Sequence, residues 1–130
     1  MQAETHLKID ASLCGDPVAL EQGRAVVRLQ TDHRMVADHA GLVHGGFVFG
    51  LADYAAMLAV NDPNVVLGAA ETRFTHPVRE GDVVIAVAEV VAVDRRKHTV
   101  HVSCSVDETV VMEGSFMTFV LKNHVLTGRV

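Results

Sequence analysis

The sequence predicts an α+β fold in which a long antiparallel β-sheet wraps around one central helix. Residues 45–61 are rich in Ala, Leu and Met, a composition that favours a helix. This block is apolar on nearly all sides, so other elements must cover most of it. After Pro63 the chain consists of long β-branched segments separated by turn residues. Five or six antiparallel strands can cover such a helix only by curling around it.

Length and composition indicate a single domain over residues 1–130. Apolar residues make up 49% of the chain and charged residues 21%, which is typical of a folded globular protein. The 16 acidic and 11 basic residues give a net charge of −5, and no basic stripe is present. We therefore expect no nucleic-acid partner.

The N-terminal residues and the cysteines indicate a cytoplasmic protein. The opening MQAETHLKID lacks the basic-then-apolar order of a signal peptide. The longest apolar stretch is interrupted by Asp53 and is too short and glycine-rich to span a membrane. Cys14 and Cys104 are expected to remain free thiols.

Strand and turn signals place the elements along the chain. Residues 5–10 and 23–30 are expected to form an opening hairpin, turned by the CGDP and EQG segments. Residues 31–44 show no clean period and predict a loop that includes up to one helical turn. The helix should end at NDPN, because a helix rarely continues through the residue before a proline. Four further strands are expected, at 65–76, 83–93, 98–106 and 109–122.

A single sheet of this kind would leave open strand edges and one bare end of the helix. A homodimer that joins two sheets edge to edge would cover both. We therefore expect a homodimer or a dimer of dimers.

Gly45 and Gly46 lie where the predicted helix begins. A helix N-terminus presents unpaired N–H groups and the positive end of the dipole, which suit an anionic or developing oxyanion oxygen. Glycine there lets a ligand approach the backbone closely. A tight turn into the helix explains the same two residues equally well.

Asp53 is the single charge in the apolar helix. Carboxylates are rarely buried without a partner or a purpose, so Asp53 is a candidate general base, nucleophile or structural acceptor. A position on the one solvated side of the helix is the alternative. Gly45 and Asp53 stand ~12 Å apart along one helix, too far to grip one carbonyl together. Two antiparallel helices meeting across a dimer interface would bring Gly45 of one chain close to Asp53 of the other.

The segment HGGFVFGLADYAAMLAVN, residues 44–61, resembles the His-Gly-Gly and Leu-Ala-Asp helix of the hotdog-fold acyl-CoA thioesterases, in the phenylacetate-degradation (PaaI-like) branch. The order of strands, helix and strands agrees over most of the chain, as do the PVREGD turn and the basic hairpin that follows. The resemblance implies that Asp53 is the nucleophile or general base. It also implies that the Gly45 N–H binds the thioester oxygen, in a site between subunits.

Two features depart from that branch. Where the branch commonly has Asn, six residues before the motif His, this sequence has Asp38, and a second carboxylate near Asp53 would raise one of their pKa values. In addition, GFVFGLADYA together with THP is similar to the fluoroacetyl-CoA thioesterase, in which a helix Glu works with a His of a Thr-His pair. This second resemblance implies that His76 is an acid–base partner, and a solvated His at a strand end is the alternative.

Further residues are expected to border the substrate. His44 is expected to fix the loop by hydrogen bonds, beside Gly46 and Asp38. Phe47 and Tyr54 either line an acyl or aryl pocket or belong to the core.

The basic turn Arg95-Arg96-Lys97 is either solvated or a phosphate clamp for coenzyme A. His98 and His101 lie on opposite strand faces and cannot share a metal without distortion. We expect no metal and no cofactor other than the coenzyme A of the substrate.

These observations favour hydrolysis of an acyl-CoA or aryl-CoA thioester. Asp53, directly or through water, would attack the carbonyl while the Gly45 N–H and the helix dipole hold the oxyanion. A hotdog-fold hydratase or dehydratase acting on a hydroxyacyl thioester, with Asp38 and His39, is one alternative. A non-catalytic acyl-CoA-binding protein is another, but such sensors usually carry a DNA-binding module for which 130 residues leave no space. The presence of Asp53 in the helix favours a catalytic function over binding alone.

Overall fold

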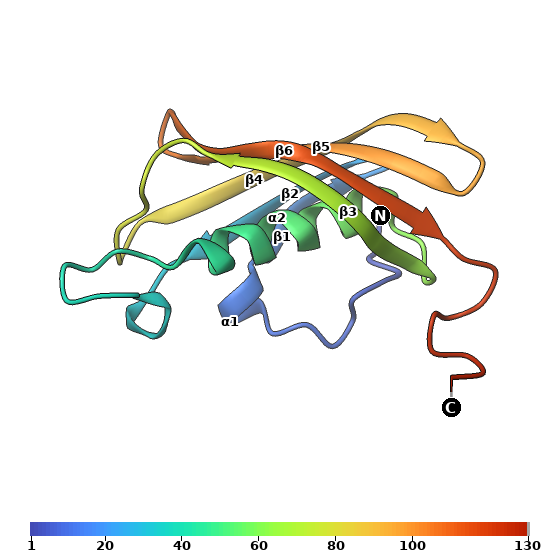
Figure 1. The fold of residues 1–130 in the computed structure, drawn as a ribbon, viewed down its shortest axis with the longest axis horizontal. Coiled ribbons are helices and arrows are strands. Elements are labelled where there is room, and N and C mark those ends of the chain that lie inside the picture. The colour runs from blue at the N-terminus through green and yellow to red at the C-terminus, as the bar shows by residue number, and fades with distance from the viewer. Residues whose placement is uncertain (130) are drawn as a thin grey trace.

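The computed structural model describes residues 1–129 and shows an antiparallel sheet of six strands curved around one long helix (Figure 1). Helix α2, Gly45–Val60, lies against the inner face of the sheet, on β2, β4 and β5. The strand order is β1-β2-β4-β5-β6-β3. The predicted α+β architecture is confirmed, and it is the arrangement of the hotdog fold. The strands are β1 (Asp16–Glu21), β2 (Arg24–Gln30), β3 (Val65–Phe74), β4 (Val83–Asp94), β5 (Lys97–Val106) and β6 (Thr109–Val120).

Helix α2 forms where its composition predicts it and ends where NDPN begins. Asn61 takes a left-handed conformation, φ 55°, and its N–H donates to the Met57 carbonyl at 2.8 Å. Leu51 and Leu58 are fully buried, as is Phe116 on β6. Burial of each such side chain stabilises the fold by about 1.5–3 kcal/mol. The helix is therefore the centre of the core.

Strands β3 to β6 confirm the four predicted segments. In β5, Val100, Val102 and Cys104 are buried on the helix side, whereas His101 is exposed on the outer face. Among residues 1–129, strand β3 pairs only with β6 and stands at one edge of the sheet, as β1 does at the other. Both edges are therefore open in the single chain.

The predicted strand at residues 5–10 is wrong. This segment runs along the side of α2 that faces away from the sheet (Figure 1), and a short helix α1, Ala11–Cys14, follows it. The strand that forms the hairpin with β2 is instead β1, which includes residues expected to form a turn. The side chains of β1 are mostly exposed and a bulge lies between Pro17 and Ala19, so the strand has no clean hydrophobic period.

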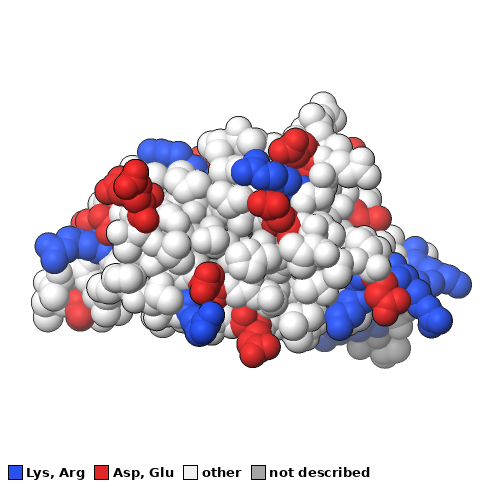
Figure 2. All heavy atoms as spheres, turned by 90° about the horizontal axis from the view of Figure 1, so that it is seen from above, with Lys and Arg blue, Asp and Glu red and all other residues white. Residues whose placement is uncertain are grey.

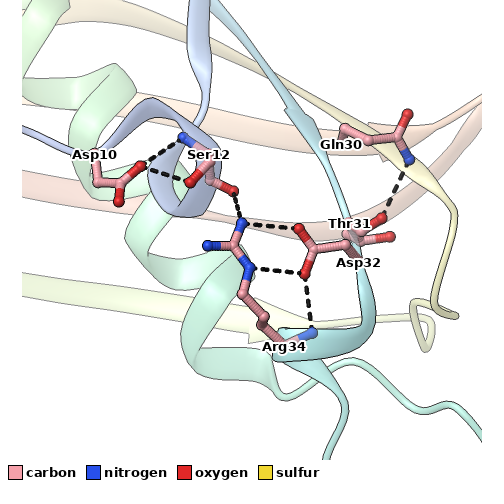
Figure 3. A network of polar contacts seen from close by, with 6 residues as sticks. All are labelled: Asp10, Ser12, Gln30, Thr31, Asp32 and Arg34. Carbon is pink, nitrogen blue, oxygen red and sulfur yellow. Dashed lines mark hydrogen bonds and ion pairs between the residues drawn. The ribbon is translucent and has the colours of Figure 1, made fainter.

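Hydrogen bonds tie the N-terminal segment, residues 1–14, to the rest of the fold (Figure 3). Arg34, in the short 3-10 helix η1 (His33–Met35), donates to the Ser12 carbonyl at 3.3 Å and pairs with Asp32 at 2.9 Å. The Asp10 carboxylate accepts from the Ser12 N–H at 2.9 Å and caps α1. Near the other end, the Asn61 side chain accepts from the Glu4 N–H at 2.7 Å. The segment is thus held at both ends.

Residues 31–44 form the predicted loop, with η1 as its one helical turn. Both cysteines are free thiols, and burial raises the pKa of Cys104 to about 12. Within residues 1–129, no helix combines the length and the apolar character needed to cross a bilayer.

Candidate active site

Gly45 is the first residue of α2, so its N–H has no intrahelical acceptor. His44 precedes it with φ −62° and ψ 131°, and its side chain makes no capping hydrogen bond. The His44 N–H instead donates to the Met35 carbonyl at 2.9 Å. The backbone N–H of His44 thus helps to hold this loop. The N-terminus of α2 is left open to a ligand.

A cavity of about 320 Å³ lies at this end of α2. Its walls are mainly apolar, and it also contains Thr75 and His76. A Cβ added to Gly45 would lie 3.4 Å from Cε1 of Phe74, so this ring lies over the start of the helix. The apolar wall includes Val48, Phe74 and Val111.

A hydrogen bond to the backbone of β6 holds the His76 ring in place. Its Nδ1 lies 3.0 Å from the Val110 carbonyl oxygen, which also accepts from the Thr75 hydroxyl at 2.7 Å. A carbonyl can only accept, so Nδ1 carries the proton and the neutral ring has its lone pair on Nε2. The structure thus brings His76 and Gly45 to one cavity.

Asp53 does not line that cavity. It is half-buried, and burial raises the pKa of its carboxyl, while the charge of His6 lowers it. The His6 ring lies 6.1 Å, between centroids, from the ring of Tyr54. Sequence reasoning missed His6, because it lies in a segment predicted as a strand and no motif marks it.

Asp38 stabilises the loop before α2 by hydrogen bonds to its backbone. Its Oδ1 accepts from the N–H groups of Ala40 at 3.0 Å and Leu42 at 3.1 Å. Asp38 and His39 border a separate cavity and do not line the one at Gly45. Within the chain, the pKa of Asp53 is raised by burial and not by Asp38.

The remaining predicted residues divide between the start of α2 and the core. The His44 ring lies over Gly46, where an added Cβ would stand 3.1 Å from ring atoms. Phe47 is half-buried, with its ring edge-on to His44 at 6.4 Å between centroids. Tyr54 is buried.

The exposed turn Arg95-Arg96-Lys97 lies far from Gly45. Lys97 pairs with Phe119, at the end of the sheet where β3 begins and α2 ends. Figure 2 shows basic side chains gathered toward that end of the sheet's outer face, with both signs of charge interspersed elsewhere. Because α2 has 16 residues, about 24 Å separates its two ends. Within one chain this turn and Gly45 therefore lie at opposite ends of α2.

Residues 40–113 match the family model of the thioesterase superfamily. The chain belongs to this superfamily. The match includes both Gly45 and Asp53, on the helix whose motif carries the resemblance described above.

Two curated relatives are longer than the chain. It is 49% identical over 121 residues to a protein of Aquifex aeolicus named methylthioribose-1-phosphate isomerase, an alignment that covers 93% of this chain and 26% of that protein. It is 33% identical over 105 residues to the transcription factor FapR of Bacillus velezensis, covering 78% of this chain and 56% of that protein. The chain thus spans about a quarter of the length of the first relative and about half of the length of the second.

Two solved structures are similar over most of the chain. An uncharacterized protein of Pyrococcus horikoshii has 49% identity and a TM-score of 0.96, with 97% of both chains covered. A mutant of the phenylacetic acid degradation protein PaaI from Thermus thermophilus has 30% identity and a TM-score of 0.77, covering 84% of this chain and 95% of that one. The second similarity confirms the resemblance to the PaaI-like branch.

Proposed function

We propose that this chain hydrolyses an acyl-CoA or aryl-CoA thioester to the free acid and coenzyme A. The observation that carries the proposal is the arrangement along α2. Gly45 opens on an apolar cavity at the start of the helix, and the same helix holds one half-buried carboxylate, Asp53. Membership of the thioesterase superfamily supports the reaction type.

The Gly45 N–H and the positive end of the helix dipole would bind the thioester oxygen as it gains negative charge. The apolar wall formed by Val48, Phe74 and Val111 would accept the acyl or aryl part. Asp53 would take the proton of the attacking water, because the pKa that burial raises makes its carboxylate a better base. The water oxygen bonds to the carbonyl carbon, the C–S bond then breaks, and the coenzyme A thiolate takes up the proton that Asp53 received. Direct attack by the Asp53 carboxylate is the other form of this reaction.

Asp53 and Gly45 would meet across two chains. They lie ~12 Å apart along α2, and the open edge of β3 is ten residues long. Antiparallel pairing of two β3 edges about a twofold axis would set the two α2 helices antiparallel, so that Gly45 faces the partner's Asp53. The same pairing would move the partner's Arg95 turn to the Gly45 end, where it could bind coenzyme A phosphates. A homodimer or dimer of dimers thus belongs to the proposal, as does a cytoplasmic location.

The direct test is a panel of acyl-CoA and aryl-CoA substrates monitored by release of free thiol. Asp53→Asn should lower kcat by ~10²–10⁴ on the best substrate. Asp107→Asn is the matched control, because Asp107 is exposed in the β5–β6 turn and its left-handed φ of 53° suits asparagine. An Asp53→Asn protein as active as the control would refute the assignment.

The similarity to the transcription factor FapR favours binding without hydrolysis as a second candidate. In that case acyl-CoA would bind at the Gly45 cavity without being hydrolysed. Calorimetry would detect the heat of binding, and no free thiol would be released. Asp53→Asn would then leave affinity nearly unchanged. A hydratase has less support, because the Asp38 carboxylate already accepts hydrogen bonds from the Ala40 and Leu42 N–H groups within its own loop.

A further inference from the structure

Phe74 is the last residue of β3, and its ring lies over the start of α2 (Figure 1). Three of its ring atoms, Cε1, Cδ1 and Cζ, lie 3.4, 3.7 and 3.9 Å from the position that a Cβ on Gly45 would take. Phe74 is 54% exposed, whereas Val48 and Val111 of the same cavity are each 2% exposed. The two valines thus belong to the floor of the cavity, and the phenylalanine ring belongs to its rim.

Hydrogen bonds on both sides fix the backbone of Phe74. Up to this residue β3 is paired with β6, and Phe74 stands opposite Met112. Directly after it, the Thr75 N–H donates to the Val111 carbonyl at 2.9 Å, and the Thr75 hydroxyl donates to the Val110 carbonyl at 2.7 Å. The ring is therefore carried by a paired part of the sheet and not by a free loop.

The short separation between Phe74 and Gly45 determines which part of a substrate the ring would meet. A thioester oxygen that accepts from the Gly45 N–H would lie about 2.7–3.2 Å from the nitrogen, with the carbonyl carbon about 1.2 Å further on. The apolar cavity extends from Gly45 past the Phe74 ring. The acyl carbons nearest to the thioester carbonyl would therefore be in van der Waals contact with the ring when they enter the cavity.

The cavity offers no charged partner to an acyl group. Among residues 1–129, its lining contains neither a basic nor an acidic side chain apart from His76. Thr75 and His76 both donate to the Val110 carbonyl, at 2.7 and 3.0 Å. A carboxylate on the acyl group would lose its water in this cavity and gain neither a lysine, an arginine nor a free hydroxyl donor, which disfavours its binding.

The volume of the cavity limits the size of the acyl group. It measures about 320 Å³. With about 30 Å³ for each heavy atom, the volume that one water molecule takes in the liquid, about ten heavy atoms would fit. A short or medium aliphatic acyl group or a single aromatic ring meets this limit, whereas a long fatty acyl chain exceeds it.

We propose that Phe74 is a specificity-determining residue that restricts the substrate to uncharged acyl groups of about ten heavy atoms or fewer. Its ring contacts the acyl carbons beside the thioester carbonyl and narrows the mouth of the cavity. The inference rests on the proposed hydrolysis, because it concerns the acyl part of the same substrate.

The first test compares kcat/KM along the straight-chain series from acetyl-CoA to palmitoyl-CoA. In Phe74→Ala the lost ring enlarges the cavity, so the ratio of kcat/KM for lauroyl-CoA to that for octanoyl-CoA should rise at least ~10-fold. Phe74→Trp adds bulk at the same place and should lower the ratio for octanoyl-CoA to butyryl-CoA. Val18→Ala is the control, because Val18 is an exposed apolar residue of β1 at the opposite edge of the sheet, and it should leave both ratios unchanged.

Two results of this test would overturn the proposal. An equal fall of kcat/KM for all chain lengths in both Phe74 variants would show that the ring only supports the start of α2. A chain-length profile that is the same in wild type and both variants would show that the ring does not meet the acyl group.

The second test compares succinyl-CoA with butyryl-CoA in the wild-type protein. The two acyl groups have the same number of carbons, but the succinyl group carries a terminal carboxylate. Because the cavity holds no lysine or arginine for this carboxylate, kcat/KM should be at least ~10²-fold lower for succinyl-CoA. Equal hydrolysis of the two thioesters would overturn the proposal.

Binding measurements separate this inference from the proposed function. If no acyl-CoA releases thiol, the proposed hydrolysis fails, and dissociation constants for the same acyl-CoA series are measured by calorimetry. A preference for octanoyl-CoA over lauroyl-CoA that Phe74→Ala reduces would support selection of the acyl group by Phe74. Affinities that do not depend on the acyl group, or the absence of binding, would overturn the inference together with the proposed function.

Discussion

Replacing Gly45 by proline is expected to remove one N–H from the proposed oxyanion site while leaving α2 in place. Proline is favoured at the first position of a helix, and the extended conformation of His44, φ −62° and ψ 131°, suits the residue before a proline. The added Cβ would lie 3.4 Å from the Phe74 ring, an ordinary van der Waals contact. Gly45→Ala carries the same Cβ but keeps its N–H, so the difference between the two variants isolates the hydrogen-bond donor.

Loss of one oxyanion donor should lower kcat by ~10²–10³, or about 2.7–4 kcal/mol in transition-state stabilisation. If Gly45 and Asp53 of different chains form each site, Gly45→Pro and Asp53→Asn chains should rescue each other. Each mixed dimer would hold one intact site and one doubly damaged site. Random exchange makes about half of the dimers mixed, so activity should return to about a quarter of wild type.

The assay mixes the two inactive proteins in equal amounts, confirms exchange by native mass spectrometry and follows thiol release. Mixing either variant with itself provides the baseline. If the two groups acted within one chain, every site would keep one lesion and mixing would restore nothing. That result, with exchange confirmed, would refute the inference drawn from the ~12 Å separation along α2.

Three other outcomes are expected. Light scattering should show a dimer or tetramer at micromolar concentration, because β3 leaves an open edge, and a stable monomer would also remove the shared site. Asp53→Asn should raise stability to urea at neutral pH. Burial raises the pKa of Asp53 above its usual 3.8 in the native state, so protonation of Asp53 stabilises the native state relative to the unfolded chain. This stabilisation is lost as the pH rises through the pKa of Asp53 in the unfolded chain and then in the native state. The gain should vanish near pH 3, and a gain independent of pH would contradict this account. Phe116→Ala should lower the free energy of unfolding by about 3–5 kcal/mol, since Phe116 is fully buried against Phe49, whereas Val91→Ala at an exposed position should have little effect.

The sequence by itself determined the central helix and the four strands after it. Residues 45–61 have a local composition that only a covered helix satisfies, and Pro63 ends it nearby. The β-branched segments carry a period of two with turn residues between them, which β5 illustrates. The first strand could not be located in this way. Strand β1 is an exposed edge strand with a bulge, and its side chains do not alternate between buried and exposed.

The motif on α2 also determined two members of the candidate site, Gly45 and Asp53, and their separation along one helix. What only the tertiary structure decided is which distant residues accompany them. It placed His76 at the Gly45 cavity, the Arg95 turn at the far end of α2, and the His6 ring against Tyr54 of α2. These neighbours come from strands, turns and a segment pinned by Asn61 and Arg34, far along the chain from the groups they meet. Local sequence periods specify which face of an element is buried, but contacts between distant segments depend on how the sheet curls and where loops are anchored.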